Sequence, residues 1–199
     1  LLKPKYRNYW KNDIDLIHKK YSKFILINTN FDVGNAKVGN QNLKTFFETN
    51  PDHTEYLKKL YLEKFDVMSK VMNSYIEAIH ILSNHFKNTD FIIRPHPSES
   101  DLPYKKAFKN KDNVHVIYEG NVVKWILASS GVIHYDCTTG IESVLADKNT
   151  ISYIPKSDNK EITWLPVLVS QKVTEIDDLI KKTNNIISVQ PNKNLSKDV

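Results

Sequence analysis

The sequence predicts an α/β fold with a Rossmann-like, doubly wound parallel sheet. Short apolar runs typical of buried strands alternate with segments of helical periodicity along the 199 residues. Because strands separated by helices of this length need right-handed crossovers, we expect them to lie parallel in one sheet. Two of the runs, which begin at Phe91 and Ile133, break abruptly into polar residues. Ligands bind beyond the carboxyl ends of such strands, so these breaks indicate a site.

The expected strands and helices alternate along the chain. The run Phe24–Asn28 is expected to be a buried strand, followed by a polar loop at 29–42. Apolar residues three and four positions apart predict a long helix at about 54–86, and a second strand follows at 91–93. The further strands are expected at 114–117, 131–134 and 150–154, and the further helices at 122–128, 139–146 and 174–184.

The sequence also predicts how the chain is divided. Residues 1–20 are expected to be a linker-like segment that follows a missing N-terminal domain, and residues 21–187 one Rossmann-like domain. A charged loop is expected at 156–161, and residues 188–199 are expected to be a polar, flexible tail. The chain opens with leucine rather than methionine, which suggests a fragment of a longer protein.

Composition excludes several classes of protein. A hydrophobic fraction of 40% and an aromatic fraction of 11% are typical of a globular rather than a disordered chain. The single cysteine, Cys137, excludes an internal disulfide framework and indicates a reducing compartment, so we expect a cytoplasmic protein. The net charge of +5 comes from dispersed lysines, whereas nucleic-acid readers usually cluster arginines with exposed aromatics. We therefore expect no nucleic-acid partner, and only weak peripheral association with the anionic inner face of a membrane.

The first candidate site is the turn that begins at Arg94. Arg94 is one of only two arginines in the sequence, and its guanidinium is a rigid donor of several hydrogen bonds. His96 offers a ring N–H, and Pro95 and Pro97 fix the backbone around it, so both side chains are suited to phosphate oxygens. The alternative is a proline-rich turn that merely ends a strand, in which His96 hydrogen-bonds a nearby carbonyl.

A second candidate site is the segment from Thr138 to Glu142. A helix that begins near Thr139 directs backbone N–H groups and the positive end of its dipole at whatever precedes it. With Thr138 and Gly140, these N–H groups would form a cradle for an anion, and Glu142 would accept hydrogen bonds from a ribose diol. The alternative is a capping box between Thr139 and Glu142, which requires no ligand.

The loop after the first expected strand is a third candidate. Asn30 and Asn35 are suited to a sugar or a phosphate, and equally to plain turns. Glu99, which follows the proline-rich turn, is a further candidate contact for the same ligand. His134 and Tyr135 end an expected strand, where burial explains them as well as contact with a base does.

Other kinds of chemistry find little support in the sequence. Nothing near Cys137 would activate it as a nucleophile, and a small residue at a tight turn explains it. The histidines lack metal-binding spacings such as HExxH, so no metal site is expected. Neither GxGxxG nor GxxxxGK[ST] occurs, so the sequence supports neither a dinucleotide oxidoreductase nor a P-loop enzyme, and no cofactor is expected.

Four segments together resemble a known family. Their order and spacing are similar to those of bacterial surface-carbohydrate biosynthesis proteins, which are relatives of GT-B-type glycosyltransferases with two facing Rossmann-like domains. The resemblance covers roughly residues 1–155 and implies that the chain is the C-terminal, donor-nucleotide-binding half of such a protein. The segments are 24–31, 93–99, 125–126 and 134–142.

A looser similarity extends to transferases that use CMP- or CDP-linked donors, such as capsule Kdo transferases, polysialyltransferases and teichoic-acid glycerophosphotransferases. In those enzymes a His-Pro histidine and a hydroxyl-rich turn contact the donor phosphates, and an acidic residue lies near the ribose. The resemblance therefore implies phosphate contacts for His96, Thr138 and Thr139, with Arg94 as a supporting cation. It implies a ribose contact for Glu142.

The resemblance implies a metal-independent transferase that takes a cytidine-activated acidic sugar, such as CMP-Kdo or a CMP-nonulosonate. Its other partner would be a saccharide or a lipid-linked saccharide acceptor. The acceptor and the general base would then belong to an N-terminal domain outside this chain. Three alternatives stay open: a polyol-phosphate transferase with a CDP-glycerol-type donor, a nucleotide-sugar epimerase, and a non-catalytic nucleotide-binding scaffold domain.

Overall fold

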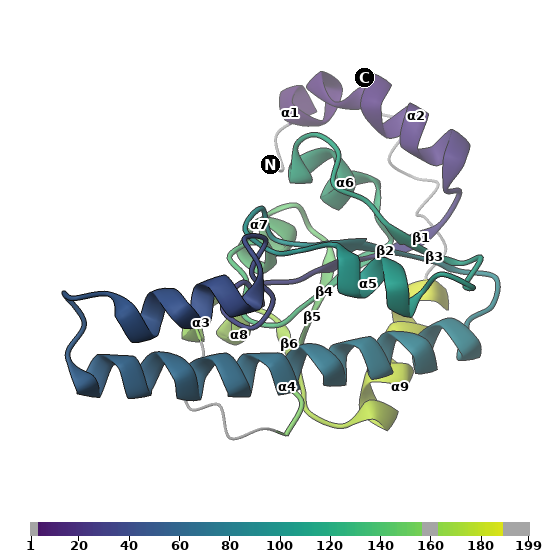
Figure 1. Cartoon of the computed structure of the whole chain (residues 1–199). Coiled ribbons are helices and arrows are strands. Elements are labelled where there is room, and N and C mark those ends of the chain that lie inside the picture. The colour runs from purple at the N-terminus through teal and green to yellow at the C-terminus, as the bar shows by residue number, and fades with distance from the viewer. Residues whose placement is uncertain (1–3, 157–162, 189–199) are drawn as a thin grey trace.

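Six parallel strands form one sheet in the part of the chain that the structure describes. They are β1 (Phe24–Asn28), β2 (Asp90–Arg94), β3 (Val114–Val116), β4 (Gly131–His134), β5 (Asn149–Tyr153) and β6 (Gln171–Val173). Their order is β3-β2-β1-β4-β5-β6, and every neighbouring pair is parallel. The computed structural model describes residues 4–156 and 163–188 (Figure 1). The predicted Rossmann-like, doubly wound α/β fold is confirmed.

Helices connect the strands and cover both faces of the sheet. They are α1 (Pro4–Tyr9), α2 (Lys11–Lys20), α3 (Asn40–Thr49), α4 (Glu55–His85), α5 (Leu102–Ala107), α6 (Val122–Ala128), α7 (Thr139–Leu145), α8 (Trp164–Leu168) and α9 (Ile176–Ser188). Figure 1 shows α2 and α6 above the sheet, and α4 and α9 below it. Within the described ranges, no helix combines the length and the apolar character needed to cross a membrane.

The central strand β1 separates two layers of core. Its five residues are all buried. Phe24 and Leu26 pack in the layer that includes α2 and α6, whereas Ile25 and Ile27 pack in the layer that includes α4 and α9. A strand covered on both faces needs apolar residues at successive positions, which explains why this segment of the sequence does not alternate.

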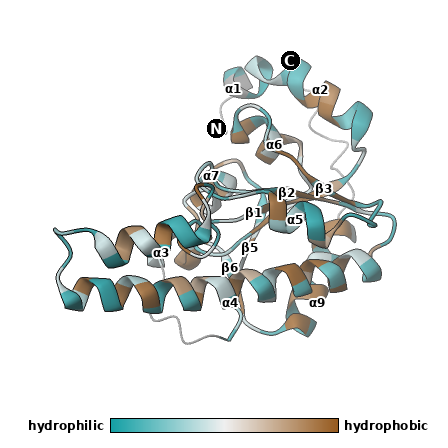
Figure 2. Cartoon of the chain, in the orientation of Figure 1, coloured by the Kyte–Doolittle hydropathy of each residue, from teal (hydrophilic) through white to brown (hydrophobic). Residues whose placement is uncertain are grey.

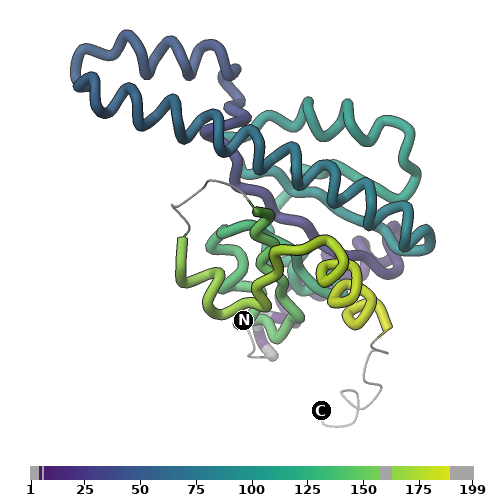
Figure 3. The backbone as a smooth tube through the Cα atoms, turned by 90° about the horizontal axis from the view of Figure 1, so that it is seen from below, coloured from purple at the N-terminus to yellow at the C-terminus, as the bar shows by residue number. Residues whose placement is uncertain are grey.

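The long helix α4 begins with a side-chain cap and extends beyond the sheet. The hydroxyl of Thr54 accepts a hydrogen bond from the N–H of Leu57 at 3.3 Å. Figure 2 shows hydrophobic and hydrophilic segments alternating along α4, as expected of an amphipathic helix. In Figure 3, α3 runs beside the first half of α4 as both project from the sheet. The rings of Phe47 and Tyr61 stack between them with centroids 4.6 Å apart.

The segment at 4–20 forms two helices where the sequence suggested a linker. Helix α2 packs against α6 through Ile14 and Ile17, which are three residues apart on one face. His18 Nε2 lies 2.9 Å from the carbonyl oxygen of Ala128, near the end of α6. These contacts attach the segment to the upper layer of the core, while the proposed division into domains stays a prediction.

Four short elements depend on tertiary contacts more than on periodicity, and none of them was predicted. Helix α3 begins inside the expected loop, and α5 follows the proline-rich turn. Helix α8 and strand β6 lie between the expected charged loop and the last helix, which begins at 176 rather than 174. Residues 157–161 of the charged loop and 189–199 of the expected tail lie outside the described residues.

Replacing Ile17 by alanine tests whether α2 belongs to the fold. Ile17 is 7% exposed, so Ile17→Ala should lower the free energy of unfolding by about 2–4 kcal/mol in urea titrations. Leu16, its neighbour on the same helix, is 64% exposed, and Leu16→Ala should change stability by less than about 0.5 kcal/mol. Equal effects of the two variants would contradict the packing of α2 on the sheet.

Candidate functional site

The strand order places a candidate site at the carboxyl ends of β1 and β4. Strands β2 and β3 lie on one side of β1, and β4, β5 and β6 on the other, so the connections diverge between β1 and β4. Asn28 and His134, the last residues of these two strands, are paired across the sheet. In open parallel sheets a crevice forms at this point, and ligands bind there.

Within the described residues, four buried hydrogen-bond acceptors at this edge lack a partner. A buried polar atom without a partner costs about 1–3 kcal/mol, so their concentration in one place requires a reason. Since all four atoms accept, the edge suits a ligand that donates hydrogen bonds, such as the hydroxyls of a ribose or a sugar, better than an ionised phosphate. The atoms are Asn28 Oδ1, His134 Nδ1, Asp136 Oδ1 and Glu142 Oε2.

His134 is a buried, neutral histidine. The hydroxyl of Ser170 donates to the carbonyl oxygen of Pro166 at 2.7 Å, so it accepts from His134 Nε2–H, 2.9 Å away. The proton therefore lies on Nε2, and Nδ1 carries the unpartnered lone pair. Burial lowers the pKa of His134 to about 4. A Cβ at Gly140 would collide with this ring, which explains the glycine at that position.

Asp136 lies in the wall of a cleft at the same edge. The cleft has a volume of about 290 Å³, and Asn30, Asp32, Lys64 and Thr163 also line it. Asp136 Oδ2 accepts a hydrogen bond from the N–H of Thr163 at 3.1 Å. Burial raises the pKa of the Asp136 carboxyl, and hydrogen bonds from Thr163 and Asn30 act against that rise. The predicted contact residue Asn30 therefore lies in a cleft, beside a carboxylate that was not predicted.

Helix α7 leaves only part of the expected anion cradle open. The N–H of Gly140 donates to the carbonyl oxygen of Cys137 at 2.9 Å. The N–H groups of Ile141 and Glu142 donate to the carbonyl oxygen of Thr138 at 3.0 and 3.4 Å. These three N–H groups are therefore used within the turn and do not form a cradle for an anion. The exposed hydroxyl of Thr138 remains accessible at the start of the helix.

The capping box between Thr139 and Glu142 does not form. No side-chain cap hydrogen bond occurs at the N terminus of α7. Thr139 Oγ1 instead accepts from Asn28 Nδ2 at 3.1 Å and donates to Cys137 Sγ at 3.1 Å, which links α7 to the end of β1. Glu142 keeps one buried oxygen without a donor, and burial raises the pKa of its carboxyl. This arrangement favours the ligand alternative for Glu142.

The guanidinium of Arg94 is hydrogen-bonded to the backbone of a neighbouring loop. Its two terminal nitrogens donate to the carbonyl oxygens of Glu119 and Gly120 at 2.8 and 2.9 Å. The guanidinium carbon lies 5.5 Å from the ring centroid of Trp125, whose indole N–H donates to the same Glu119 oxygen. Burial lowers the pKa of Arg94 from its usual value. Its observed contacts hold the loop between β3 and α6 rather than an open phosphate site.

His96 is half-exposed and tied to the loop that follows β1. Its Nδ1 lies 2.6 Å from Ser98 Oγ, and Ser98 Oγ donates to Asp32 Oδ2 at 3.0 Å. Asp32 also lines the 290 Å³ cleft. His96 is thus connected to the cleft through one serine hydroxyl.

Glu99 and Asn35 serve the structure rather than an open surface. Both are buried, and Asn35 Nδ2 donates to the carbonyl oxygen of Ser100 at 2.7 Å. The two carboxylate oxygens of Glu99 accept hydrogen bonds from five groups on the loops after β1 and β2 and on α5. The donors are Thr29 Oγ1, Phe31 N, Asn35 Nδ2, His96 N and Tyr104 Oη. These contacts join the first and third candidate segments into one unit.

The candidate residues predicted from the sequence therefore divide into two groups. His96, Thr138, Glu142 and Asn30 lie at the cleft or at the ends of β2 and β4, whereas the other predicted residues are engaged internally. These are Arg94, Glu99, Asn35, Thr139 and Gly140. Asn28 and Asp136 join the first group unpredicted. A polar residue that ends an apolar strand is the signal that could have identified Asn28.

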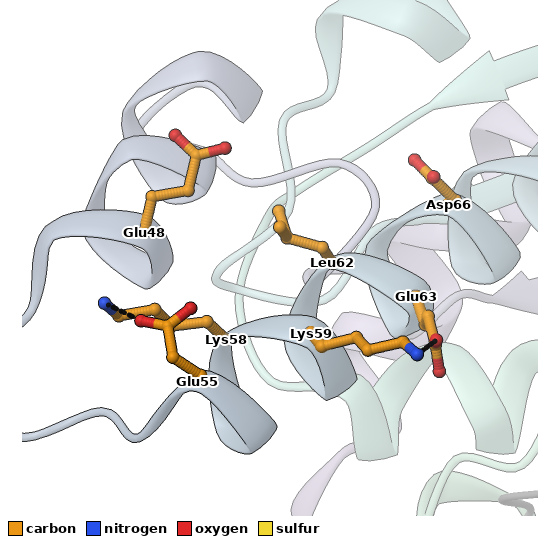
Figure 4. A pocket seen from close by; sticks show the side chains of 7 residues that line it. All are labelled: Glu48, Glu55, Lys58, Lys59, Leu62, Glu63 and Asp66. Carbon is orange, nitrogen blue, oxygen red and sulfur yellow. Dashed lines mark hydrogen bonds and ion pairs between the residues drawn. The ribbon is translucent and has the colours of Figure 1, made fainter.

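The other parts of the chain that the structure describes hold no candidate metal centre. Within residues 4–156 and 163–188, no group of three or more histidine, cysteine or acidic residues could hold a metal ion. A larger cleft of about 460 Å³ lies between α3 and α4. Figure 4 shows Lys58 paired with Glu55 and Lys59 paired with Glu63, and the N···O distances of these ion pairs are 2.8 and 3.8 Å. Exposed pairs of this kind are common on helix surfaces.

Comparisons with known proteins find a distant likeness among solved structures. No family model and no curated protein matches the chain. Among solved structures, it is similar to KpsC of Thermosulfurimonas dismutans, described as a β-Kdo 2,7-transferase, with 13% identity and a TM-score of 0.39. The match covers 87% of this chain and 48% of that one, so this chain spans about half the length of that structure.

The Glu99 carboxylate should be essential to the stability of the sheet edge. Glu99→Gln replaces an acceptor oxygen by an amide that donates, so some of the five donors lose their partner. We expect a loss of about 1–3 kcal/mol in the free energy of unfolding. Glu48→Gln, the same change at an exposed position on α3, is the control and should have little effect. Equal stability of the two variants would contradict the role assigned to Glu99.

Burial of His134 should make the fold sensitive to acid. Because its pKa falls to about 4 in the folded chain, against 6.5 for a free side chain, its contribution is complete at pH 7 and is lost as the pH falls through 6.5 toward 4. At pH 5 the loss should be on the order of 2 kcal/mol. His134→Gln should show a smaller difference between urea titrations at pH 7 and pH 5, and the exposed His85→Gln should not. An unaltered pH dependence in His134→Gln would refute this account.

Proposed function

We propose that this chain is the donor-binding domain of a GT-B-type glycosyltransferase that acts in the synthesis of bacterial surface polysaccharide. The expected donor is a nucleotide-activated sugar, and a CMP-linked Kdo or nonulosonate is the preferred candidate. The observation that carries the proposal is the set of four unpartnered acceptors at the divergence of β1 and β4. The resemblance of the sequence segments adds the donor class.

Glu142 is the proposed ribose contact. Its buried oxygen lacks a donor, and a ribose hydroxyl would supply one. A carboxylate that accepts from both hydroxyls of a diol would also recover part of the cost of its burial. The unpartnered oxygen of Asn28 lies on the adjoining strand and is suited to a further hydroxyl.

His96 and the Thr138 hydroxyl are the proposed phosphate contacts. Both are accessible, and they follow β2 and β4, which flank β1 in the sheet. Arg94 would act indirectly, by holding the loop at Glu119 and Gly120. The cleft lined by Asn30, Asp32 and Asp136 would face the sugar, since its amide and carboxylate groups are suited to hydroxyls.

The remaining parts of the reaction would lie outside this chain. A saccharide or lipid-linked saccharide acceptor and a general base would belong to a facing N-terminal domain, as the resemblance of the sequence segments implies. The domain would work in the cytoplasm, with peripheral contact to the inner membrane where the acceptor is lipid-linked. We expect it to use no metal and no cofactor, with His96 and the Thr138 hydroxyl as the groups that stabilise the leaving phosphate.

Calorimetric titration with CMP, CDP and UDP, without added metal, tests the proposal. CMP should bind most tightly, and His96→Ala should weaken its binding by about 1.5–3 kcal/mol, the cost of losing a charge-assisted hydrogen bond. The exposed His85→Ala is the control. Preference for CDP would favour the polyol-phosphate transferase, and preference for UDP the epimerase. Binding of none of the three would contradict the proposal.

Glu142→Gln should weaken CMP binding without lowering the stability of the fold. The carboxyl has a raised pKa in the folded chain, so its ionisation costs stability as the pH rises through that pKa. At pH 7 the uncharged variant should therefore be at least as stable as the parent chain, although it binds CMP more weakly. A destabilised variant with unchanged CMP affinity would remove Glu142 from the site.

A further inference from the structure

The proton positions around His96 follow from its contacts. Ser98 Oγ lies within hydrogen-bond distance of both His96 Nδ1, at 2.6 Å, and Asp32 Oδ2, at 3.0 Å. A hydroxyl has one proton to donate, and an ionised carboxylate can only accept. The hydroxyl must therefore donate to Asp32, and the shorter contact is a hydrogen bond only if Nδ1 carries a proton and donates to Oγ.

The opposite arrangement is less favourable. The backbone N–H of Ser98 points at His96 Nδ1 from 3.3 Å, and Nδ1 can accept it only in the arrangement in which Ser98 Oγ donates to a bare Nδ1. This contact is longer than the two that Ser98 Oγ makes, at 2.6 and 3.0 Å. In that arrangement the hydroxyl oxygen would face the Asp32 carboxylate at 3.0 Å with no proton between them. Two acceptors at that distance repel each other, so the chain of hydrogen bonds runs from His96 through Ser98 to Asp32.

The backbone around this chain of hydrogen bonds is fixed. The carbonyl oxygen of Ser98 accepts from the N–H of Lys37 at 2.8 Å, and the N–H of Glu99 donates to the carbonyl oxygen of His96 at 2.9 Å. The N–H of His96 itself donates to the buried Glu99 carboxylate at 3.2 Å. The backbone on both sides of His96 is thus held in place, and Nε2 of its ring makes no hydrogen bond within the described residues.

We propose that Asp32, acting through Ser98, is a positioning residue that holds the His96 proton on Nδ1 and presents Nε2 to the phosphate of the donor nucleotide. The phosphate that links a nucleotide to its sugar is ionised, and its oxygens only accept hydrogen bonds. Nε2 therefore donates to it after the ring has taken a second proton from the solvent, and the Asp32 carboxylate, two hydrogen bonds away, balances the new charge. The phosphate part of this inference rests on the proposed function.

Asp32 would then act at the sites proposed for two parts of one ligand, the sugar and the phosphate. It lines the cleft proposed for the sugar, together with Asp136 and Lys64, and it sets the state of the histidine proposed for the phosphate. Of the two histidines at this edge, His134 carries its proton on Nε2, whereas His96 carries it on Nδ1. The two histidines therefore present different ring nitrogens: His96 presents Nε2 after β2, and His134 presents Nδ1 at the end of β4.

The first test needs no ligand. Long-range ¹H–¹⁵N NMR spectra of the 199-residue chain, recorded at a pH where the ring is neutral, report which nitrogen of His96 is protonated. We expect Nδ1–H in the parent chain, and a shift toward the Nε2–H form that free histidine prefers in Ser98→Ala and Asp32→Ala. Ser74→Ala, on the exposed side of α4, should leave the signal unchanged. An Nε2–H form in the parent chain would overturn the inference.

The second test measures affinity for CMP. Asp32→Asn keeps an acceptor for Ser98 but removes the charge, and it should weaken CMP binding about three- to tenfold. Asp52→Asn, the same change at an exposed turn, should have no effect. Unchanged affinity in Asp32→Asn would refute the role of Asp32 toward the phosphate. If the parent chain binds no nucleotide, the proposed function fails, and the tautomer measured without ligand still decides whether Asp32 positions His96.

Discussion

The buried carboxylate of Glu99 is the interaction on which the edge of the sheet depends. It gathers five donors from the loops after β1 and β2 and from α5 around two oxygens. The backbones of these loops are also joined directly, by Lys37 N to Ser98 O at 2.8 Å and by Ser100 N to Asn35 O at 3.0 Å. Because His96, Asn30 and Asp32 sit on these loops, their positions depend on one carboxylate that is only 4% exposed.

The strands and the long helix could be predicted because their signals are local. Phe24–Asn28 is apolar at four successive positions, and α4 repeats its apolar residues over 31 positions. Helix α3 could not be predicted in this way, since its place is set by aromatic contacts with α4 across a turn. Strand β6 has three residues, too few for any periodicity, and forms because β5 offers it an edge.

The candidate site could be predicted only in outline. Strand ends followed by polar residues pointed to the edge of the sheet where His96 is accessible and where Glu142 Oε2 lacks a partner among the described residues. Arg94 was expected at a phosphate because arginine is rare in this chain, yet rarity does not reveal a partner, and two carbonyl oxygens from 25 and 26 residues away hold it. Asp136 could not be identified from the sequence, because its partners Thr163 and Asn30 lie beside it only in the folded chain.

The position of β1 also determines at which stage of folding the crevice can form. It is the first strand of the chain, yet it lies in the middle of the sheet and pairs with β2 on one side and β4 on the other. During synthesis β2 and β3 can add to it early, whereas pairs such as Ile25 with Gly131 must wait until most of the chain has emerged. A nascent chain that ends before β4 therefore has half a sheet and no crevice. A nucleotide can therefore stabilise only the complete sheet, and it cannot guide the early steps of folding.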